Sequence, residues 1–432
     1  SHTHSSHGGE AVSGIDSGHG EASSGSSSNS TGGHSSSQDS SHGHGEHHSH
    51  QHHALFYLFT CIILGTALVH ITTYVPALSG VQPTVATFVL GMLFALLFEV
   101  FHLKDNTGVL GESYNMWMSI DPHLLLYVLL PVLLTGDAMN IDTSVAKVVA
   151  KQCLWLAGPG VLMGAMLAAL FIYAYLPYQW DFMLCLSLGS ILAATDPVAV
   201  VSLLKELGAS PVLTVQIQGE SLLNDGVAIV LFSVTYDIVK GEAYEFRDVA
   251  LILVKTAMCA WFLGMFIGGV FAAWIRAAGN RLEHSSATIQ VTLTICCAYM
   301  SFYVAEGILE ISGVLSTVAA ALVLADSIWP AVVNRQAMHE VWHMLETFGN
   351  TLIFFLAGSL TARCMVRIDF VDYLHLFYLY GILVLIRAFI ILVSRPILQL
   401  LHPDRIPVSL AEAAVITWGG LRGAVGLALA IS

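Results

Sequence analysis

Charge is scarce in this sequence. Of its 432 residues, 11% are Asp, Glu, Lys or Arg, whereas a soluble domain carries about a quarter. Only 16 residues are Lys or Arg against 30 Asp or Glu, and the net charge is −14. Such a chain lacks the clustered cations that bind nucleic acid. With 55% hydrophobic residues and a mean hydropathy of +0.72, the composition excludes an ordinary soluble enzyme and a disordered scaffold, and it predicts a polytopic membrane protein.

Cysteine spacing gives no sign of a disulfide framework or a zinc knuckle. We interpret the cysteines as small hydrophobic residues, because all seven lie in or beside apolar runs: Cys61, Cys153, Cys185, Cys259, Cys296, Cys297 and Cys364. The sequence begins at Ser1 rather than Met and stops inside an apolar stretch at Ser432. We therefore expect a fragment that is truncated at its C-terminus.

Long apolar runs dominate the chain after Ala54. A helix needs about 20 apolar residues to cross a bilayer, which predicts about twelve spans. The expected spans are 55–75, 83–101, 123–139, 153–176, 182–204, 211–239, 248–275, 287–305, 313–329, 341–361, 373–394 and 409–432. Continuous rather than alternating apolar runs favour helices over a barrel. The predicted fold is therefore an all-α membrane domain over residues 54–432.

Residues 1–53 form a Ser-, Gly- and His-rich tail without Lys or Arg. We expect disorder, because this tail has almost no apolar side chains to bury. Its histidines suggest loose metal affinity or a pH-responsive patch rather than a specific metal site. A slight excess of Lys and Arg on alternate joints, together with a sequon at Asn29, places the tail on the extracellular or lumenal side.

The fifth span contains the sequence Thr195-Asp196-Pro197 near its middle. Pro197 lacks a backbone N–H and disfavours helix at Asp196. A broken helix at membrane depth is tolerated where it lines a cavity, and it marks transporter binding sites. The alternative is a kink near a helix end.

The sixth span carries Gly219-Glu220-Ser221-Leu-Leu-Asn224-Asp225. Helical spacing pairs Ser221 with Asp225, and Glu220 with Asn224, on one face. No basic residue lies near Asp225, so its carboxyl group must hold a proton or a cation. The oxygen atoms of Ser221, Asn224 and Thr195 suit an alkali ion without adding charge. For Ser221 and Asn224, a polar contact between helices is the alternative.

The twelfth span contains Gly420-Leu421-Arg422-Gly423-Ala424. Glycines beside Arg422 permit close approach or unwinding. A buried guanidinium needs a carboxylate, and we expect Glu220 to form this structural ion pair. For Arg387, in the eleventh span, the sequence identifies no partner.

These three motifs, in this order, resemble the monovalent cation/proton antiporter family, the sodium/proton exchangers, over about residues 55–432. The segment from His343 through Asn350 to Gly358 resembles the plant plasma-membrane salt-tolerance exchangers. Animal exchangers tend to carry an acid where Asn350 stands, and a role taken from that acid does not transfer to this chain. Asn350 is therefore a secondary candidate.

The resemblance implies about 12–13 helices in inverted repeats, with the two broken helices crossing beside Asp225. It implies a homodimer in which a core (153–239 and 373–432) moves against dimerisation helices (55–139 and 248–361). It places the ion on Asp225, with help from Thr195 and Ser221, and it pairs Glu220 with Arg422. Asn224 and Asp196, next to these residues, are further candidates for the site. Asp137 and Asp142, after the third span, are either part of the ion route or simply loop acids.

The predicted function is antiport of sodium or potassium against protons, without a cofactor, for intracellular pH and sodium homeostasis. If Asp225 carries one proton or one cation in turn, exchange is one for one and insensitive to voltage. The resemblance favours the plasma membrane. A channel, a zinc carrier and a membrane enzyme fit less well, because the spans show no filter-like repeat, no set of His ligands, and no nucleophile–base pair or phosphate loop.

Overall fold

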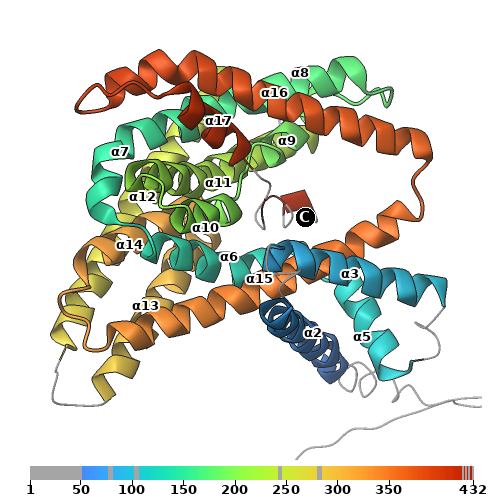
Figure 1. Cartoon of the computed structure of the whole chain (residues 1–432), viewed down its shortest axis with the longest axis horizontal. Helices are drawn as coiled ribbons and strands as arrows, with labels where there is room; N and C mark the ends of the chain where they lie inside the picture. Colours follow the sequence, from blue (N-terminus) through green and yellow to red (C-terminus); the bar gives the residue numbers. More distant parts are fainter. Residues whose placement is uncertain are drawn as a thin grey trace, which may run out of the picture. The chain divides into compact units, whose positions relative to one another are not determined.

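The computed structural model describes residues 51–75, 81–101, 107–241, 246–279, 285–420, 423, 426, 429 and 430. Of the predicted tail, only η1 (Gln51–His53) belongs to them. The helices, arranged as in Figure 1, are α2 (Ala54–Tyr74), α3 (Pro83–Val100), α5 (Val109–Met118), α6 (Pro122–Met139), α7 (Thr143–Trp155), α8 (Val161–Tyr175), α9 (Phe182–Ile191), α10 (Val198–Glu206), α11 (Pro211–Val239), α12 (Phe246–Ala277), α13 (Ser285–Tyr303), α14 (Gly313–Ser327), α15 (Arg335–Met365), α16 (Phe370–Leu401) and α17 (Leu410–Trp418). Two π-helical segments, η2 (Leu156–Gly160) and η3 (Val304–Ile308), follow α7 and α13.

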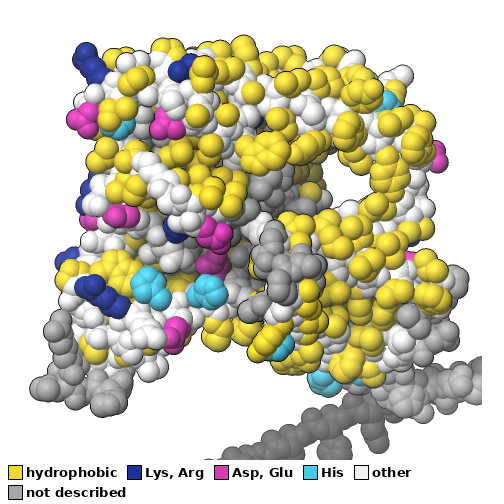
Figure 2. Space-filling model, in the orientation of Figure 1, with side chains coloured by type: hydrophobic (Ala, Val, Ile, Leu, Met, Phe, Trp, Pro, Cys, Tyr) yellow, Lys and Arg dark blue, Asp and Glu magenta, His cyan; other side chains and the backbone are white. Residues whose placement is uncertain are grey.

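Seven stretches within the described residues are long and apolar enough to cross a membrane: Ala54–Thr72, Pro83–Val100, Thr143–Tyr175, Pro211–Val239, Leu251–Ala277, Ser286–Ile308 and Phe370–Leu401. In the most apolar part of α11, 56% of residues are buried, against 17% in α2 and α16. α11 is therefore an inner helix, whereas α2 and α16 present apolar side chains outward. Hydrophobic side chains also cover much of the face in Figure 2. This confirms the predicted all-α membrane architecture.

Two elements differ most from the sequence prediction, although α15 and α16 also extend up to seven residues beyond the predicted spans 341–361 and 373–394. The fourth span was expected from residue 153, but α7 begins at Thr143. The Asp142 side chain caps this helix by accepting from the Ser144 N–H at 3.0 Å. Its first turns were not predicted as part of the span, because Lys147 and Lys151 interrupt the apolar run there. The helix α5 was not predicted, because ten residues with Glu112 in the first turn are too short for a span.

Close backbone contact fixes α15 against α3. A Cβ atom on Gly91 would lie 2.2 Å from the Phe355 carbonyl oxygen, and one on Gly358 would lie 2.1 Å from that of Phe88. Only glycine permits this approach. α15 is thereby held as a rigid wall, and the site described below includes its residue Asn350.

Side chains of α11 pack in a buried cluster with α6 and α14, which includes Leu222, Ile229, Leu134 and Val318. Separate clusters join α8, α9 and α16, and α2, α3 and α15. Figure 1 shows α16 and α17 on one side of the bundle and α2, α3 and α15 on the other. The division into a moving core and dimerisation helices stays a prediction.

Candidate functional site

The chain leaves the helical conformation between α9, which ends at Ile191, and α10, which begins at Val198. Pro197 stands immediately before α10 and cannot donate a backbone hydrogen bond. Thr195 in this segment is buried, with 3% of its surface exposed, and Asp196 is half-buried. Extended backbone at this depth needs partners for its polar groups.

Two side chains of α11 supply those partners. Asn224 accepts from the Thr195 backbone N–H at 3.5 Å and donates from Nδ2 to the Thr195 hydroxyl oxygen at 2.6 Å. The Ser221 hydroxyl donates to the Thr195 carbonyl oxygen. Because the Ser221 hydroxyl hydrogen is used in this way, the lone pairs of its Oγ are left to accept a hydrogen bond or to coordinate a cation. The residues that form this polar contact between the helices are therefore also the candidate ligands.

Asp225 lies one residue beyond this clamp. Its side chain is buried, and its Oδ1 accepts no hydrogen bond within the described residues. An ionised carboxylate in such a place is costly unless a cation offsets its charge. The group is consequently suited to hold a proton and a cation in turn.

A cavity of about 60 Å³ meets this carboxyl group and has room for a few waters or one dehydrated cation. It brings together candidates from four parts of the chain: Thr195, Asp196, Pro197, Ser221, Asp225, Asp137 and Asn350. The fully buried Asn224 does not line it. Asn224 therefore holds the broken segment, and the neighbouring oxygens face the cavity.

The structure separates the two secondary acids. Asp137 lies within α6 and lines the cavity. Asp142 is exposed and caps α7, where hydrogen bonds from Ser144 lower its pKa. The capping contact fits the loop-acid interpretation of Asp142, and a place for Asp142 on the ion route stays a prediction.

The chain after α17 meets the broken segment beside this cavity. α17 ends at Trp418, and a Cβ on Gly423 would lie 2.1 Å from Cβ of Asp196. A Cβ atom on Gly426 would lie 3.5 Å from the Ile191 carbonyl oxygen. Close contact between the two interruptions therefore needs glycine at position 423.

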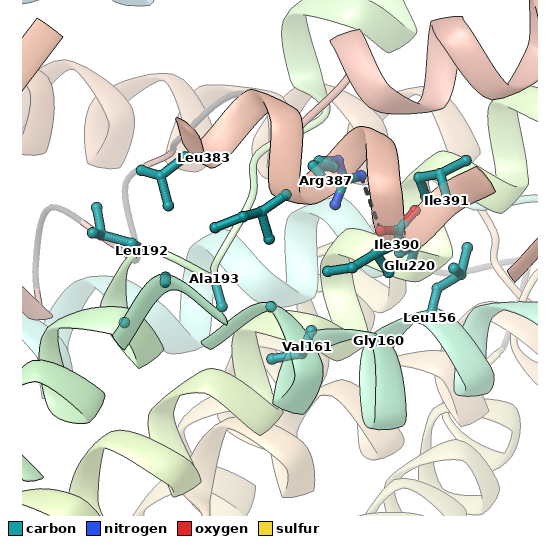
Figure 3. Close-up of a pocket in the computed structure, with 14 residues that line it drawn as sticks. Leu156, Gly160, Val161, Leu192, Ala193, Glu220, Leu383, Arg387, Ile390 and Ile391 are labelled. Atoms are coloured by element: carbon teal, nitrogen blue, oxygen red, sulfur yellow. Dashed lines mark ion pairs between the residues drawn. The ribbon is translucent and has the colours of Figure 1, made fainter. Parts of the chain in front are cut away.

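Glu220 forms its ion pair with Arg387 of α16, at 2.9 Å between Oε1 and Nη2 (Figure 3). Arg387 also donates to the Ile416 carbonyl oxygen at 3.2 Å, and a Cβ on Gly420 would collide with its side chain. This guanidinium thus joins α11, α16 and α17. The predicted partner Arg422 lies outside the described residues, and within them Arg387 takes the assigned role.

Sequence reasoning missed two residues here. Arg387 was visible as a charge inside a span, but its partner is set by the packing of α16 on α11. Glu346 of α15 is half-buried, and its Oε2 lies 3.6 Å from the Cβ position of Gly136, next to Asp137. Its spacing of four residues before Asn350 was the available signal.

Comparison with known proteins agrees with this geometry. The model of the family described as sodium/hydrogen exchanger, transmembrane, matches residues 56–432. The chain is 34% identical over 380 residues to sodium/hydrogen exchanger 8 of Arabidopsis thaliana, covering 86% of this chain and 48% of that protein. It is 33% identical over 321 residues to the Na(+)/H(+) antiporter ApNhaP of Aphanothece halophytica, covering 73% of this chain and 58% of that protein.

The fold is similar to that of the sodium proton antiporter MjNhaP1 from Methanocaldococcus jannaschii, with a TM-score of 0.64 at 18% identity, covering 88% of this chain and 86% of the other. The chain spans about half the length of the plant relative named above, at 48%. The family model covers most of the chain, and the relationship that the three motifs predicted is confirmed. The chain is an integral membrane protein and belongs to the transmembrane sodium/hydrogen exchanger family.

Proposed function

We propose that this chain is a secondary antiporter, not an enzyme, and that it exchanges sodium ions for protons across a membrane. The observation that carries the proposal is Asp225: a buried carboxyl group whose Oδ1 has no hydrogen-bond partner within the described residues, on the wall of a cavity beside a broken helix. The names of the relatives, exchangers and antiporters of sodium and protons, support the same activity.

Exchange arises because a proton and a sodium ion compete for the same carboxyl group, that of Asp225. A proton on Asp225 neutralises it, and so does a sodium ion bound by its oxygens with Ser221 and Thr195. Because the loaded site has the same net charge in both cases, transport is one for one and insensitive to membrane potential. No cofactor takes part, and potassium would compete only to the extent that the oxygen ligands fit its larger radius.

The cycle further requires that Asp225 face each side of the membrane in turn. We infer a movement of the core helices against the dimerisation helices of a homodimer, with the crossing of Asp196 and Gly423 carried along in the core. The proposed setting is the plasma membrane, with the N-terminal tail outside, where exchange regulates intracellular pH and sodium.

The test is sodium-driven proton flux in proteoliposomes for the wild type and Asp225→Asn. Asparagine has nearly the same shape but cannot release a proton, so the flux should fall to that of empty liposomes. The matched control is Asp237→Asn, a half-buried acid on the same helix, which should keep the flux. Undiminished exchange in Asp225→Asn would refute the proposal, and a flux that follows an imposed potential would refute one-for-one exchange.

A further inference from the structure

A polar strip runs along α15 toward the cavity. His339, His343, Glu346 and Asn350 are spaced by four, three and four residues, a pattern that places them on one side of a helix. His339 and His343 are exposed, Glu346 and Asn350 are half-buried, and Asn350 lines the cavity of Asp225. The strip therefore leads from the surface to the candidate site.

Glu346 is the acidic member of this strip, and it lies against α6 where Gly136 has no side chain. Its Cβ and Oε2 lie 3.7 and 3.6 Å from the Cβ position of that glycine. The next residue of α6, Asp137, lines the cavity with Asp225. Glu346 and Asp137 thus place two carboxyl groups, from α15 and α6, beside the route from the exposed end of α15 to the cavity. We call this route the approach.

Charges of both signs face Glu346. Asp196 and Asp137 are the acidic neighbours, from the broken segment and α6, and His343 and Lys205 are the basic ones, from α15 and α10. Figure 2 shows His and acidic side chains close together left of the centre. Glu346 forms no ion pair with a Lys or Arg in the part of the chain that the structure describes. The negative charge of Glu346 is therefore available to attract a cation that enters the approach.

A second observation points to a ligand at the inner end of this route. Asp225 is 9% exposed, lines the cavity and has an Oδ1 without a hydrogen-bond partner among the described residues. Fixed negative charges along a narrow, low-dielectric path concentrate cations there. The charge on Glu346 is placed to do this for a cation moving toward Asp225.

We propose that Glu346 is a cation-attracting residue whose carboxylate, together with Asp137, draws the cation from the exposed end of α15 to Asp225. The proposal rests on the antiport function above and deepens it, because it assigns the route by which the cation reaches the site. Glu346 acts on the cation before binding and does not join the Asp225 site itself.

The experiment measures sodium-dependent proton flux in proteoliposomes for the wild type, Glu346→Gln and Glu346→Asp. Loss of the charge should raise the KM for sodium about 3- to 10-fold while the maximal rate stays within about twofold. Glu346→Asp should restore most of the affinity, because it keeps the charge. The increase in KM should shrink when choline chloride is added, since salt screens attraction at a distance.

The matched control is Glu340→Gln. Glu340 is an exposed acid of the same helix whose Oε1 accepts from Gln336 Nε2 at 2.8 Å, so the KM should not change. An unchanged KM in Glu346→Gln, or a loss confined to the maximal rate and equal at all salt concentrations, would overturn the proposal. If the wild type itself showed no sodium-driven proton flux, the proposed function would fail instead.

Discussion

Asn224 holds Thr195 at two points, accepting from its backbone N–H at 3.5 Å and donating to its hydroxyl oxygen at 2.6 Å. This pair joins the middle of α11 to the unwound segment between α9 and α10. It also places Asp225, the next residue of α11, beside that segment. The polar contact between the helices therefore sets the geometry of the candidate ion site.

Replacing Asn224 tests this clamp. Asn224→Ala leaves the Thr195 N–H without its partner at a fully buried position, which should cost about 1–3 kcal/mol of stability. We expect a lower midpoint of thermal unfolding in detergent, and reduced exchange because the broken segment is no longer held. Asn115→Ala, at an exposed position of α5, is the control. Equal midpoints for the two variants would contradict the clamp.

The Glu220–Arg387 pair should contribute far more to the stability of the fold than an ion pair on the surface. The side chains of Glu220 and Arg387 are 4% and 17% exposed, whereas those of Lys147 and Asp326 are 68% and 43% exposed. Arg387→Ala removes the basic partner that the buried Glu220 carboxylate has among the described residues, which should cost about 3–5 kcal/mol. Lys147→Ala should cost under about 1 kcal/mol.

Thermal unfolding and yield of folded protein measure this contrast. Adding Glu220→Gln to Arg387→Ala removes the stranded charge and should recover part of the stability. If Arg387→Ala were as stable as Lys147→Ala, the assignment of Arg387 as the partner of Glu220 would be wrong.

Asp137 and Asp142 should respond differently to substitution. Asp137→Asn removes a carboxylate from the cavity wall and should raise the KM for sodium. Asp142→Ala should leave this KM unchanged and lower only the unfolding midpoint, because Asp142 caps α7. Transport kinetics of both variants check the distinction, and a raised KM in Asp142→Ala would place that acid on the ion route.

The capping role of Asp142 also predicts a pH dependence. Hydrogen bonds from Ser144 lower the pKa of Asp142 in the folded protein, so the unfolded chain binds the proton more readily. The stabilisation is therefore complete above the ordinary pKa of aspartate and is lost as pH falls through the lowered pKa. The difference in unfolding midpoint between wild type and Asp142→Ala should be smaller at about pH 3 than at about pH 7. A constant gap would exclude this ionic contribution.

Local signals were sufficient for much of the fold. The bounds of α11, 211–239, agree with the sequence prediction, because Pro211 stands at the first helical position directly after Ser210. The interruption after Ile191 was predicted from the sequence Thr195-Asp196-Pro197, although Pro131 and Pro396 lie inside unbroken helices. The start of α7 could not be found in this way, since capping by Asp142 and a polar first turn do not resemble a membrane span.

Partners between distant helices could not be predicted from the sequence. Glu220 and Arg387 were both visible as charges within spans, but only the packing of α11 against α16 and α17 brings them together. Glu346 was part of the segment that resembles the plant exchangers. Its position beside Asp137 depends on the absence of a side chain at Gly136, which is a contact between α15 and α6.

The close contact between Gly423 and Asp196 gives the last prediction. A Cβ on Gly423 would lie 2.1 Å from Cβ and 2.7 Å from Oδ2 of Asp196, so Gly423→Ala must push the two interruptions apart. We expect strongly reduced exchange and a lower unfolding midpoint, because overpacking of a close contact costs about 1–3 kcal/mol. Gly381→Ala is the matched control, since nothing lies within 4 Å of its Cβ position. There alanine should stabilise α16 slightly without altering exchange. If Gly423→Ala exchanged sodium and protons at the rate of Gly381→Ala, the two interruptions could not be in the contact that the site requires.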